Sequence, residues 1–263
     1  MIFRSADGVD YCQFEHLAAC RDVGHAVFFR TRGCSDAPFD RLNVSLSVGD
    51  AVERVTANRR RVADALGAAE LVFVRQVHGH GVRVVDGRTA EPGAALPEAD
   101  VLITDRAGKF LTVQVADCQP ILIYDPVRRV VANVHCGWRG SAADVPGRAV
   151  EALRVGFGCA AGDLLVGIGP SLGPCCAEFV NYREELPAHL WRYRHDTVYF
   201  DFWDMTRDQL MAAGVAADRI ETSRLCTRCH TDRFFSYRHA KRTGRFAAVI
   251  GLRDDPDRCH RAP

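Results

Sequence analysis

The sequence predicts an α+β fold in a single domain, residues 1–263, with a largely antiparallel or mixed β-sheet core flanked by helices. Three β-like apolar runs follow one another at 110–117, 120–125 and 129–135, with links too short for helical crossovers. Helical periodicity between the strand clusters indicates helices packed outside a sheet. The chain is 48% hydrophobic and 25% charged, which is typical of globular domains.

The strand series begins at residues 26–32, a run rich in Val and Phe. Residues 71–79 and 82–86 are also β-like, and we expect them to pair as a hairpin around the sequence HGHG. The further strands that we expect are 99–105, 110–117, 120–125, 129–135, 164–169 and 245–252.

Three helices are expected between these strands. Residues 50–67 place apolar side chains on one face and end in a glycine suited to the left-handed C′ position. Residues 141–158 begin with Ser141 as the expected N-cap, with Asp144 three residues later in a capping box. Residues 204–214 form the third helix and also end in glycine.

The charge balance and the apolar segments limit the partners of this protein. Lys and Arg number 34 against 33 Asp and Glu, so we expect no nucleic-acid partner. Asp117 interrupts the longest apolar stretch, well short of the ~20 residues that span a bilayer. The N-terminus has no apolar core of a signal peptide, which predicts a cytoplasmic protein with no membrane partner. The polar residues 253–263 are expected to form a frayed tail.

The eleven cysteines are not expected to form a disulfide framework, because their number is odd and no export signal is present. Cys226, Cys229 and His230 form a CxxCH sequence, but covalent haem attachment also requires export. The CxxC pair lacks a second CxxC for a four-ligand zinc site, and the adjacent Cys175 and Cys176 are expected to have the wrong geometry. We therefore expect this segment to be structural.

Three side chains that suit a metal ion stand where apolar runs give way to loops. They are His78, Cys118 and His135. Imidazole and thiolate both bind Zn²⁺, and three protein ligands leave a fourth position for water or substrate. The alternative is that all three are residues at the edge of the core, satisfied by backbone groups.

Two further segments suit an anion. Residues 167–179 are rich in Gly and Pro, and the backbone N–H groups of such a loop can bind phosphate, although no P-loop ending is present. Arg238 and Arg245 could hold a phosphate or a carboxylate. The alternatives are a tight glycine turn and ordinary surface arginines.

Taken together, these segments resemble the multicopper polyphenol oxidase or laccase-domain family, which is associated with purine nucleoside phosphorolysis and adenosine deamination and includes peptidoglycan-editing-factor members. An ordered set of motifs over residues 26–252 is specific, although each alone is weak. The matching segments are FRTRGCS, RLNVSLSVGD with ANRRR, RQVHGHGV, VADCQPILIYD, VHCGWRG, GPSLGPCCAEF, and FFSYR with TGR.

Carried over residue by residue, the resemblance implies a zinc site at the three residues named above and a surrounding nucleoside and phosphate site. Arg30, Cys34 and Cys136 depart from the family pattern, and Cys136 places a spare thiol beside a ligand, where it could compete for metal or oxidise. The implied catalytic residues are His78, Cys118, His135, Arg32, Asp117 and Glu178, and the implied substrate-binding residues are Arg32, Asn43, Arg139, Arg238 and Arg245.

The resemblance implies a zinc-dependent enzyme that phosphorolyses adenosine, inosine, guanosine and methylthioadenosine and deaminates adenosine. One alternative is a copper phenol oxidase, but the chain has ten histidines and a single HxH pair, too few for a multicopper centre. Copper bound in vitro would not be evidence for an oxidase, because Cu²⁺ binds most protein sites more tightly than the other divalent first-row metals do. The others are a peptidoglycan-precursor editing hydrolase and a zinc-stabilised interaction module, which would bind its metal through four protein ligands. The sequence leaves the oligomeric state unknown.

Overall fold

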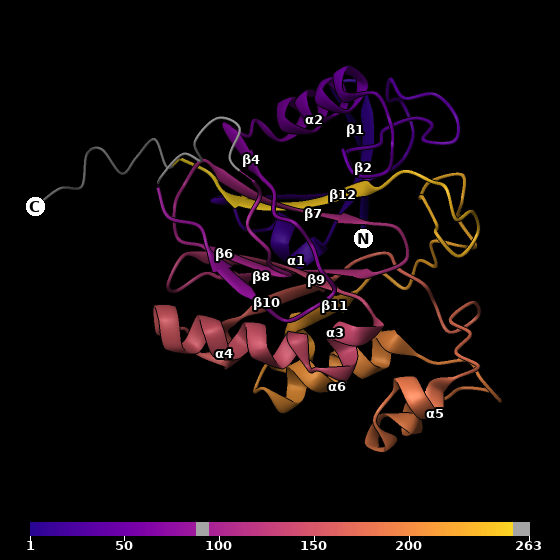
Figure 1. Cartoon of the computed structure of the whole chain (residues 1–263). Coiled ribbons are helices and arrows are strands. Elements are labelled where there is room, and N and C mark those ends of the chain that lie inside the picture. Colours follow the sequence, from indigo (N-terminus) through magenta and orange to yellow (C-terminus); the bar gives the residue numbers. More distant parts are fainter. Residues whose placement is uncertain (88–94, 255–263) are drawn as a thin grey trace, which may run out of the picture.

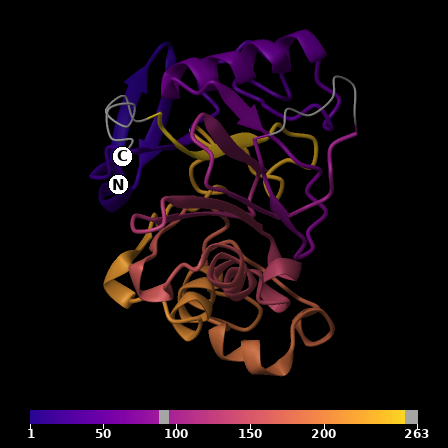
Figure 2. The ribbon, with the colours of Figure 1, turned by 90° about the vertical axis from the view of Figure 1, so that its left-hand side faces the viewer.

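The core consists of two mixed six-stranded sheets packed face to face, with helices on both outer surfaces (Figures 1 and 2). The computed structural model describes residues 1–87 and 95–254. Helix α2 covers one sheet, and α4 and α6 cover the other, so the molecule has four layers. The predicted α+β class with a mixed sheet core is confirmed. Most of the expected tail at 253–263 lies outside the described residues.

The first sheet joins strands from both ends of the chain. Its central strand β12 pairs antiparallel with β3 and β7, and β4 adds to β7 in parallel. Its order is β1 (Ile2–Ala6), β2 (Val9–Gln13), β3 (Val23–Phe28), β12 (Phe246–Leu252), β7 (Lys109–Val115) and β4 (Glu70–Val72).

The second sheet is built around the antiparallel hairpin of β8 and β9, in which Gln119 faces Cys136 and Asp125 faces Val130. The edge strands β11 and β5 add in parallel to β10 and β6. Its order is β11 (Ile220–Thr222), β10 (Leu165–Ile168), β8 (Gln119–Asp125), β9 (Val130–Cys136), β6 (Val101–Thr104) and β5 (Val82–Val84).

Alternation along β8 and β9 fills two separate cores. Leu122 and Val131 face the first sheet, whereas Ile123 and Ala132 face α4. Both strands are therefore buried on both sides, which explains why they read as continuous apolar runs.

The long helices lie where the sequence predicts them, with one change at a start. α2 (Val52–Leu66) ends at Gly67, which has φ +61°. The predicted start at Ser141 is wrong, because α3 (Trp138–Ala142) ends before α4 begins, and Asp144 caps α4 by accepting a bond from the Gly147 amide. The remaining helical segments are α4 (Val145–Phe157), α6 (Phe202–Ala212), α1 (Glu15–Ala18), α5 (Tyr182–Glu185), η1 (Ala161–Asp163), η2 (Ala188–Tyr193) and η3 (Ala217–Arg219).

The expected hairpin of residues 71–79 and 82–86 is wrong. β4 belongs to the first sheet and β5 to the second, and residues 73–81 cross between the sheets, a stretch that we call the crossing segment. β7 and β8 likewise lie in different sheets, with Asp117 at φ +90° in the turn between them. Both crossings carry a predicted metal ligand.

Two smaller differences concern strands and membranes. The short strands β1, β2 and β11 lie outside the predicted series, and β3 begins at Val23 rather than at Ala26. Within residues 1–87 and 95–254, no helix combines the length and the apolar character that crossing a bilayer requires.

Candidate functional site

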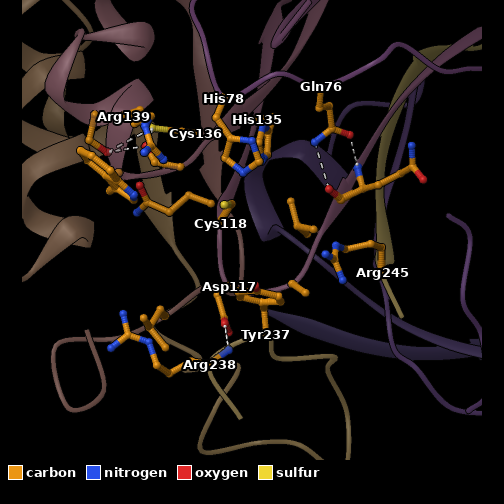
Figure 3. A pocket seen from close by; sticks show the side chains of 18 of the residues that line it. Gln76, His78, Asp117, Cys118, His135, Cys136, Arg139, Tyr237, Arg238 and Arg245 are labelled. Carbon is orange, nitrogen blue, oxygen red and sulfur yellow. Dashed lines mark hydrogen bonds between the residues drawn. The ribbon is translucent and has the colours of Figure 1, made fainter. Parts of the chain in front are cut away.

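The structure brings the three predicted metal ligands together at one end of the two sheets (Figure 3). His78 comes from the crossing segment, Cys118 directly precedes β8, and His135 lies near the end of β9. One ligand atom from each lies within 4.8 Å of the others. Residues 40 and 17 positions apart along the chain (118 − 78 and 135 − 118) thus form a single donor set.

Asp100 is a buried carboxylate that positions two of these ligands. One of its oxygens accepts bonds from the His135 Nδ1 at 2.7 Å and from the His78 amide at 3.0 Å, and the other accepts from the Gly79 amide at 2.7 Å. The bond to Nδ1 leaves the His135 Nε2 lone pair free for a metal. Sequence reasoning missed Asp100, whose only signal is an acidic residue immediately before a buried strand.

The electrostatics of the site favour a deprotonated sulfur. Burial would raise the pKa of Cys118, but the imidazoles of His135 and His78 lower it to about 6. Burial would lower the pKa of His135, but the Cys118 sulfur and the Asp100 carboxylate raise it to about 9. A thiolate therefore faces a positive charge in the structure, and a bound cation would replace the imidazolium proton.

Gly137 makes room for the ligands. A Cβ atom at this position would lie 3.0 Å from His78 Cδ2 and 3.1 Å from Cys118 Sγ, closer than most real Cβ contacts. The donor set, with two imidazoles and one thiolate, suits zinc and leaves room for a fourth ligand. These residues therefore fit a metal ion.

Cys136 lines the same cavity as these residues but is not part of this donor set. It follows His135 on a strand and points to the opposite face, into the core under α4. Its sulfur lies 3.3 Å from the Ser141 hydroxyl, and burial raises its pKa to about 12. The raised pKa favours the protonated thiol at neutral pH.

His78, Cys118 and His135 line a cavity of about 1010 Å³, at the upper end of the range for small-molecule sites. Its walls come from both sheets and from the two loops that follow β10 and β11. Cations outnumber acidic groups around it. The basic residues are Arg59, Arg75, Arg139, Arg238, Lys241 and Arg245, and the acidic residues are Asp117, Glu178 and Glu185.

Two of these cations make neither an ion pair nor a side-chain hydrogen bond among the residues that the structure describes. The Arg139 guanidinium stacks on Trp138 at 4.2 Å and makes no side-chain hydrogen bond or ion pair within the described part of the chain. Lys241 lies 4.5 Å from the Tyr237 ring centroid and likewise has no ion pair among the described residues. Both are available to an anion in the cavity.

Other predicted residues line the cavity but already have partners. Both carboxylate oxygens of Asp117 accept bonds, from the Thr227 hydroxyl at 2.7 Å and from the Arg238 amide at 2.6 Å. Glu178 is exposed and lies 4.0 Å from Arg238. The Arg245 side chain donates to the backbone oxygens of its own turn. Asp117 therefore fixes the loop that carries Arg238.

Arg32 and Asn43 are not among the residues that line the cavity. Arg32 is 60% exposed and pairs with Asp10 at 2.9 Å. Asn43 is fully buried, and its side-chain oxygen accepts the Arg245 amide at 2.9 Å. Asn43 thus supports a residue of the cavity wall.

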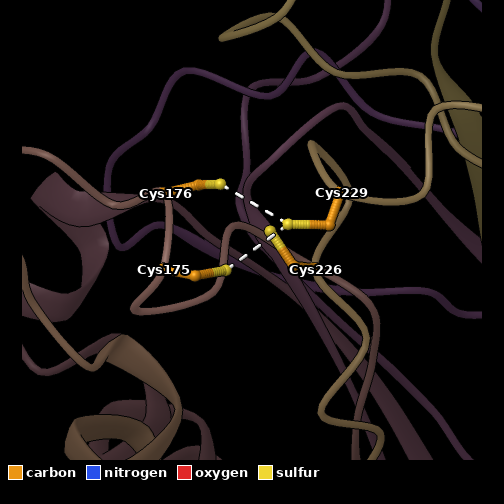
Figure 4. A group of neighbouring side chains, drawn as sticks. All are labelled: Cys175, Cys176, Cys226 and Cys229. Carbon is orange, nitrogen blue, oxygen red and sulfur yellow. Dashed lines mark hydrogen bonds between the residues drawn. The ribbon is translucent and has the colours of Figure 1, made fainter.

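The structure also contradicts the expected geometry of the cysteine pairs. The sulfurs of Cys175, Cys176, Cys226 and Cys229 gather within 4.8 Å of one another (Figure 4). The adjacent pair and the CxxC pair lie on different loops, so no local sequence pattern could have joined them.

Comparison of the sequence with known protein families identifies the family of this chain. Residues 24–253 match a family model described as multi-copper polyphenol oxidoreductase laccase. The chain belongs to this family. The resemblance inferred from the motifs is thereby confirmed.

Two similar proteins are both named purine nucleoside phosphorylase. This chain is 37% identical over 240 residues to the purine nucleoside phosphorylase YlmD of Geobacillus stearothermophilus, covering 85% of this chain and 88% of the relative. It is 36% identical over 241 residues to a purine nucleoside phosphorylase of Pseudomonas aeruginosa, covering 88% and 94%.

Solved structures agree with the fold. The crystal structure of the Geobacillus stearothermophilus YlmD has a TM-score of 0.84 at 33% identity, covering 95% of this chain and 98% of that one. A hypothetical protein YfiH of Bacillus licheniformis has a TM-score of 0.86 at 30% identity, covering 95% and 99%.

Proposed function

We propose that this protein is a zinc-dependent purine nucleoside phosphorylase, which cleaves the N-glycosidic bond of a nucleoside with inorganic phosphate. The observation that carries the proposal is a three-ligand donor set opening into a cavity lined by an excess of cations. The names of the relatives support the reaction class. The proposed substrates are adenosine, inosine, guanosine and methylthioadenosine.

The phosphate would bind to the unpartnered cations. Arg139 is held in place by its stack on Trp138, so its guanidinium is preorganised for an oxyanion. Lys241 adds a second charge, and Arg238 is fixed at its backbone by Asp117. Neutralising the phosphate dianion allows it to approach the sugar carbon without a large desolvation cost.

The purine would bind against the aromatic part of the wall. Phe179, on the loop that follows β10, lies with its ring centroid 5.0 Å from Phe202 and 6.2 Å from Trp138. Tyr237 lies on the loop that follows β11. Flat rings of this kind stack on a purine and exclude water from the glycosidic bond.

The donor set would act at the charge that develops during cleavage. Zinc bound by His78, Cys118 and His135 supplies Lewis-acid stabilisation of negative charge. The chain's own contribution is to keep Cys118 deprotonated and to hold His135 in one tautomer through Asp100.

Three other functions remain predictions of the sequence. Adenosine deamination and editing of peptidoglycan precursors rest on the resemblance, and no group in the cavity singles either out. The copper oxidase function has less support, because the two candidate metal-binding groups within the described residues contain only two histidines in total. A multicopper centre is built largely from histidine.

The test is chromatography of nucleoside reactions with metal-analysed protein. We expect base release from inosine and adenosine only when phosphate is present, and its loss in Cys118→Ala at unchanged fold. Inosine formed from adenosine would report deamination, and oxygen uptake with a phenol would report the oxidase. Absence of phosphate-dependent base release from zinc-loaded protein would overturn the proposal.

A further inference from the structure

Four cysteine sulfurs converge on one point outside the cavity. Cys175 and Cys176 lie on residues 169–181, the first cysteine loop, which follows β10. Cys226 and Cys229 lie on residues 223–245, the second cysteine loop, which follows β11. The Cys229 sulfur is 3.5 Å from that of Cys175 and 3.6 Å from that of Cys176 (Figure 4).

These separations match a tetrahedral metal site. Zn–S bonds of about 2.3 Å place sulfurs about 3.8 Å apart in a tetrahedron. Two sulfur separations, 3.5 Å and 3.6 Å, lie close to this value, and all sulfurs of the group lie within 4.8 Å of one another. Disulfides would instead bring sulfurs together in pairs at about 2.05 Å. The Cys229 sulfur has two close sulfur neighbours rather than one, which favours a single metal ion shared by the group over a disulfide.

The surroundings donate hydrogen bonds to the sulfurs, as they do around metal-bound thiolates. The Gly173 amide donates to Cys226 at 3.3 Å, and the Arg228 guanidinium donates to Cys176 at 3.5 Å. Gly173 also has no room for a side chain, because a Cβ would lie 3.1 Å from the Cys226 Cβ and 2.6 Å from the Trp203 ring. The first cysteine loop is therefore shaped to lie against the second.

Burial does not explain the cluster. Cys176 and Cys226 are buried, but Cys175 and Cys229 are exposed, and free thiols that pack as small apolar groups are normally buried. Two exposed cysteines on separate loops that meet two buried ones are better explained as ligands.

We propose that Cys175, Cys176, Cys226 and Cys229 bind a structural Zn²⁺, separate from the ion at the cavity. Four protein ligands close the coordination shell, so this ion would not take part in the reaction. This corrects the interpretation of Cys226 and Cys229 as an incomplete half site.

The proposed ion would stabilise one wall of the cavity. Backbone bonds already join the two cysteine loops, from the Ser171 amide to Leu225 at 3.2 Å and from the Thr227 amide to Ser171 at 3.0 Å. Glu178 and Phe179 follow closely after Cys176, and Arg238 lies on the same loop as Cys229. Losing this ion should therefore loosen the cationic and aromatic side of the cavity.

The experiment counts metal in the full chain by native mass spectrometry and elemental analysis. Wild type should carry one zinc for each of the two ligand groups. His78→Ala should keep the ion of the cysteine group, and Cys175→Ser with Cys229→Ser should keep only the ion of the cavity. Cys20→Ser, a half-buried thiol outside both groups, should behave as wild type.

Cobalt and thiol measurements make the result specific. Cobalt-loaded His78→Ala should show strong sulfur-to-metal charge-transfer bands, and all eleven cysteines should react with a thiol reagent after denaturation with a chelator. A folded His78→Ala protein without zinc, iron in place of zinc, or cysteines already oxidised in freshly purified wild type would each overturn the proposal. None of these readouts depends on phosphorolysis, so they stand whether or not the proposed reaction is observed.

Discussion

Replacing Asp100 with Asn tests whether the metal ligands are positioned by their neighbours. The carboxylate accepts bonds from the His135 Nδ1, from the His78 amide and from the Gly79 amide, all within 3.0 Å. The Asn side chain retains one acceptor oxygen and turns an NH₂ donor toward an N–H group on its other side. The variant therefore loses the charge opposite His135 and at least one of the three bonds.

The expected magnitudes follow from these contacts. Removing a group that orients a metal-bound histidine weakens metal affinity by about 10–100-fold, or about 1.4–2.7 kcal/mol. Leaving a buried donor unsatisfied lowers the free energy of unfolding by a further ~1–3 kcal/mol. Affinity at the cavity site should be measured by chelator competition in the Cys175→Ser, Cys229→Ser background, and stability by denaturant unfolding.

Asp125→Asn is the matched control. Asp125 is equally buried at the other end of β8, where it accepts the amides of Val127 and Arg128. Both bonds go to one carboxylate oxygen, and the other oxygen has no hydrogen-bond partner among the described residues, so an Asn oxygen can keep both. The substitution should therefore cost little stability and leave zinc affinity unchanged. If Asp100→Asn and Asp125→Asn bind zinc equally well, the argument that Asp100 positions the ligands is refuted.

Three further predictions concern the cavity and the core. Gly137→Ala should lower zinc occupancy, because the new Cβ would press on two metal ligands, whereas Gly162→Ala, with open space around it, should not; equal occupancy would count against a ligand set packed this closely. Arg139→Gln should raise the KM for phosphate by about tenfold, because one lost charged contact costs ~1.4 kcal/mol of binding free energy. The control Arg4→Gln, at an exposed position, should leave this KM unchanged. An unaltered KM for phosphate in Arg139→Gln would show that Arg139 does not bind the anion. Burial lowers the pKa of His25 to about 3 in the folded protein. As the pH falls below about 6.5, His25 therefore binds a proton in the unfolded chain but not in the folded chain, and this lowers the free energy of unfolding. Wild type should therefore lose about 1.4 kcal/mol of stability between pH 7.5 and 5.5 that His25→Gln does not lose, and urea unfolding at the two pH values measures the difference; parallel losses would contradict a neutral buried imidazole.

Local patterns picked out the three residues that the structure brings together, because each stands where an apolar strand meets a loop. His78, Cys118 and His135 carry that signature individually, and the α+β class followed from strand runs linked too closely for crossovers. The pairing of strands could not be predicted this way. Residues 71–79 and 82–86 read as a hairpin, yet the short segment between them passes from one sheet to the other.

The rest of the site depends on contacts between distant segments. Asp100 contacts the backbone of residues 77–79, which a linear pattern does not reveal. The four cysteines come together only because β10 and β11 are neighbours in the second sheet. Arg32 stands in a family motif, yet its side chain pairs with Asp10 and does not line the cavity.

The most direct test is the initial rate of hypoxanthine release from inosine, measured across a phosphate titration with protein of known zinc content. We predict a rate that rises with phosphate to saturation and that collapses in Cys118→Ser, a variant that should remain folded. Release that ignores phosphate, or a folded Cys118→Ser enzyme as fast as wild type, would contradict the assignment of this cavity to phosphorolysis.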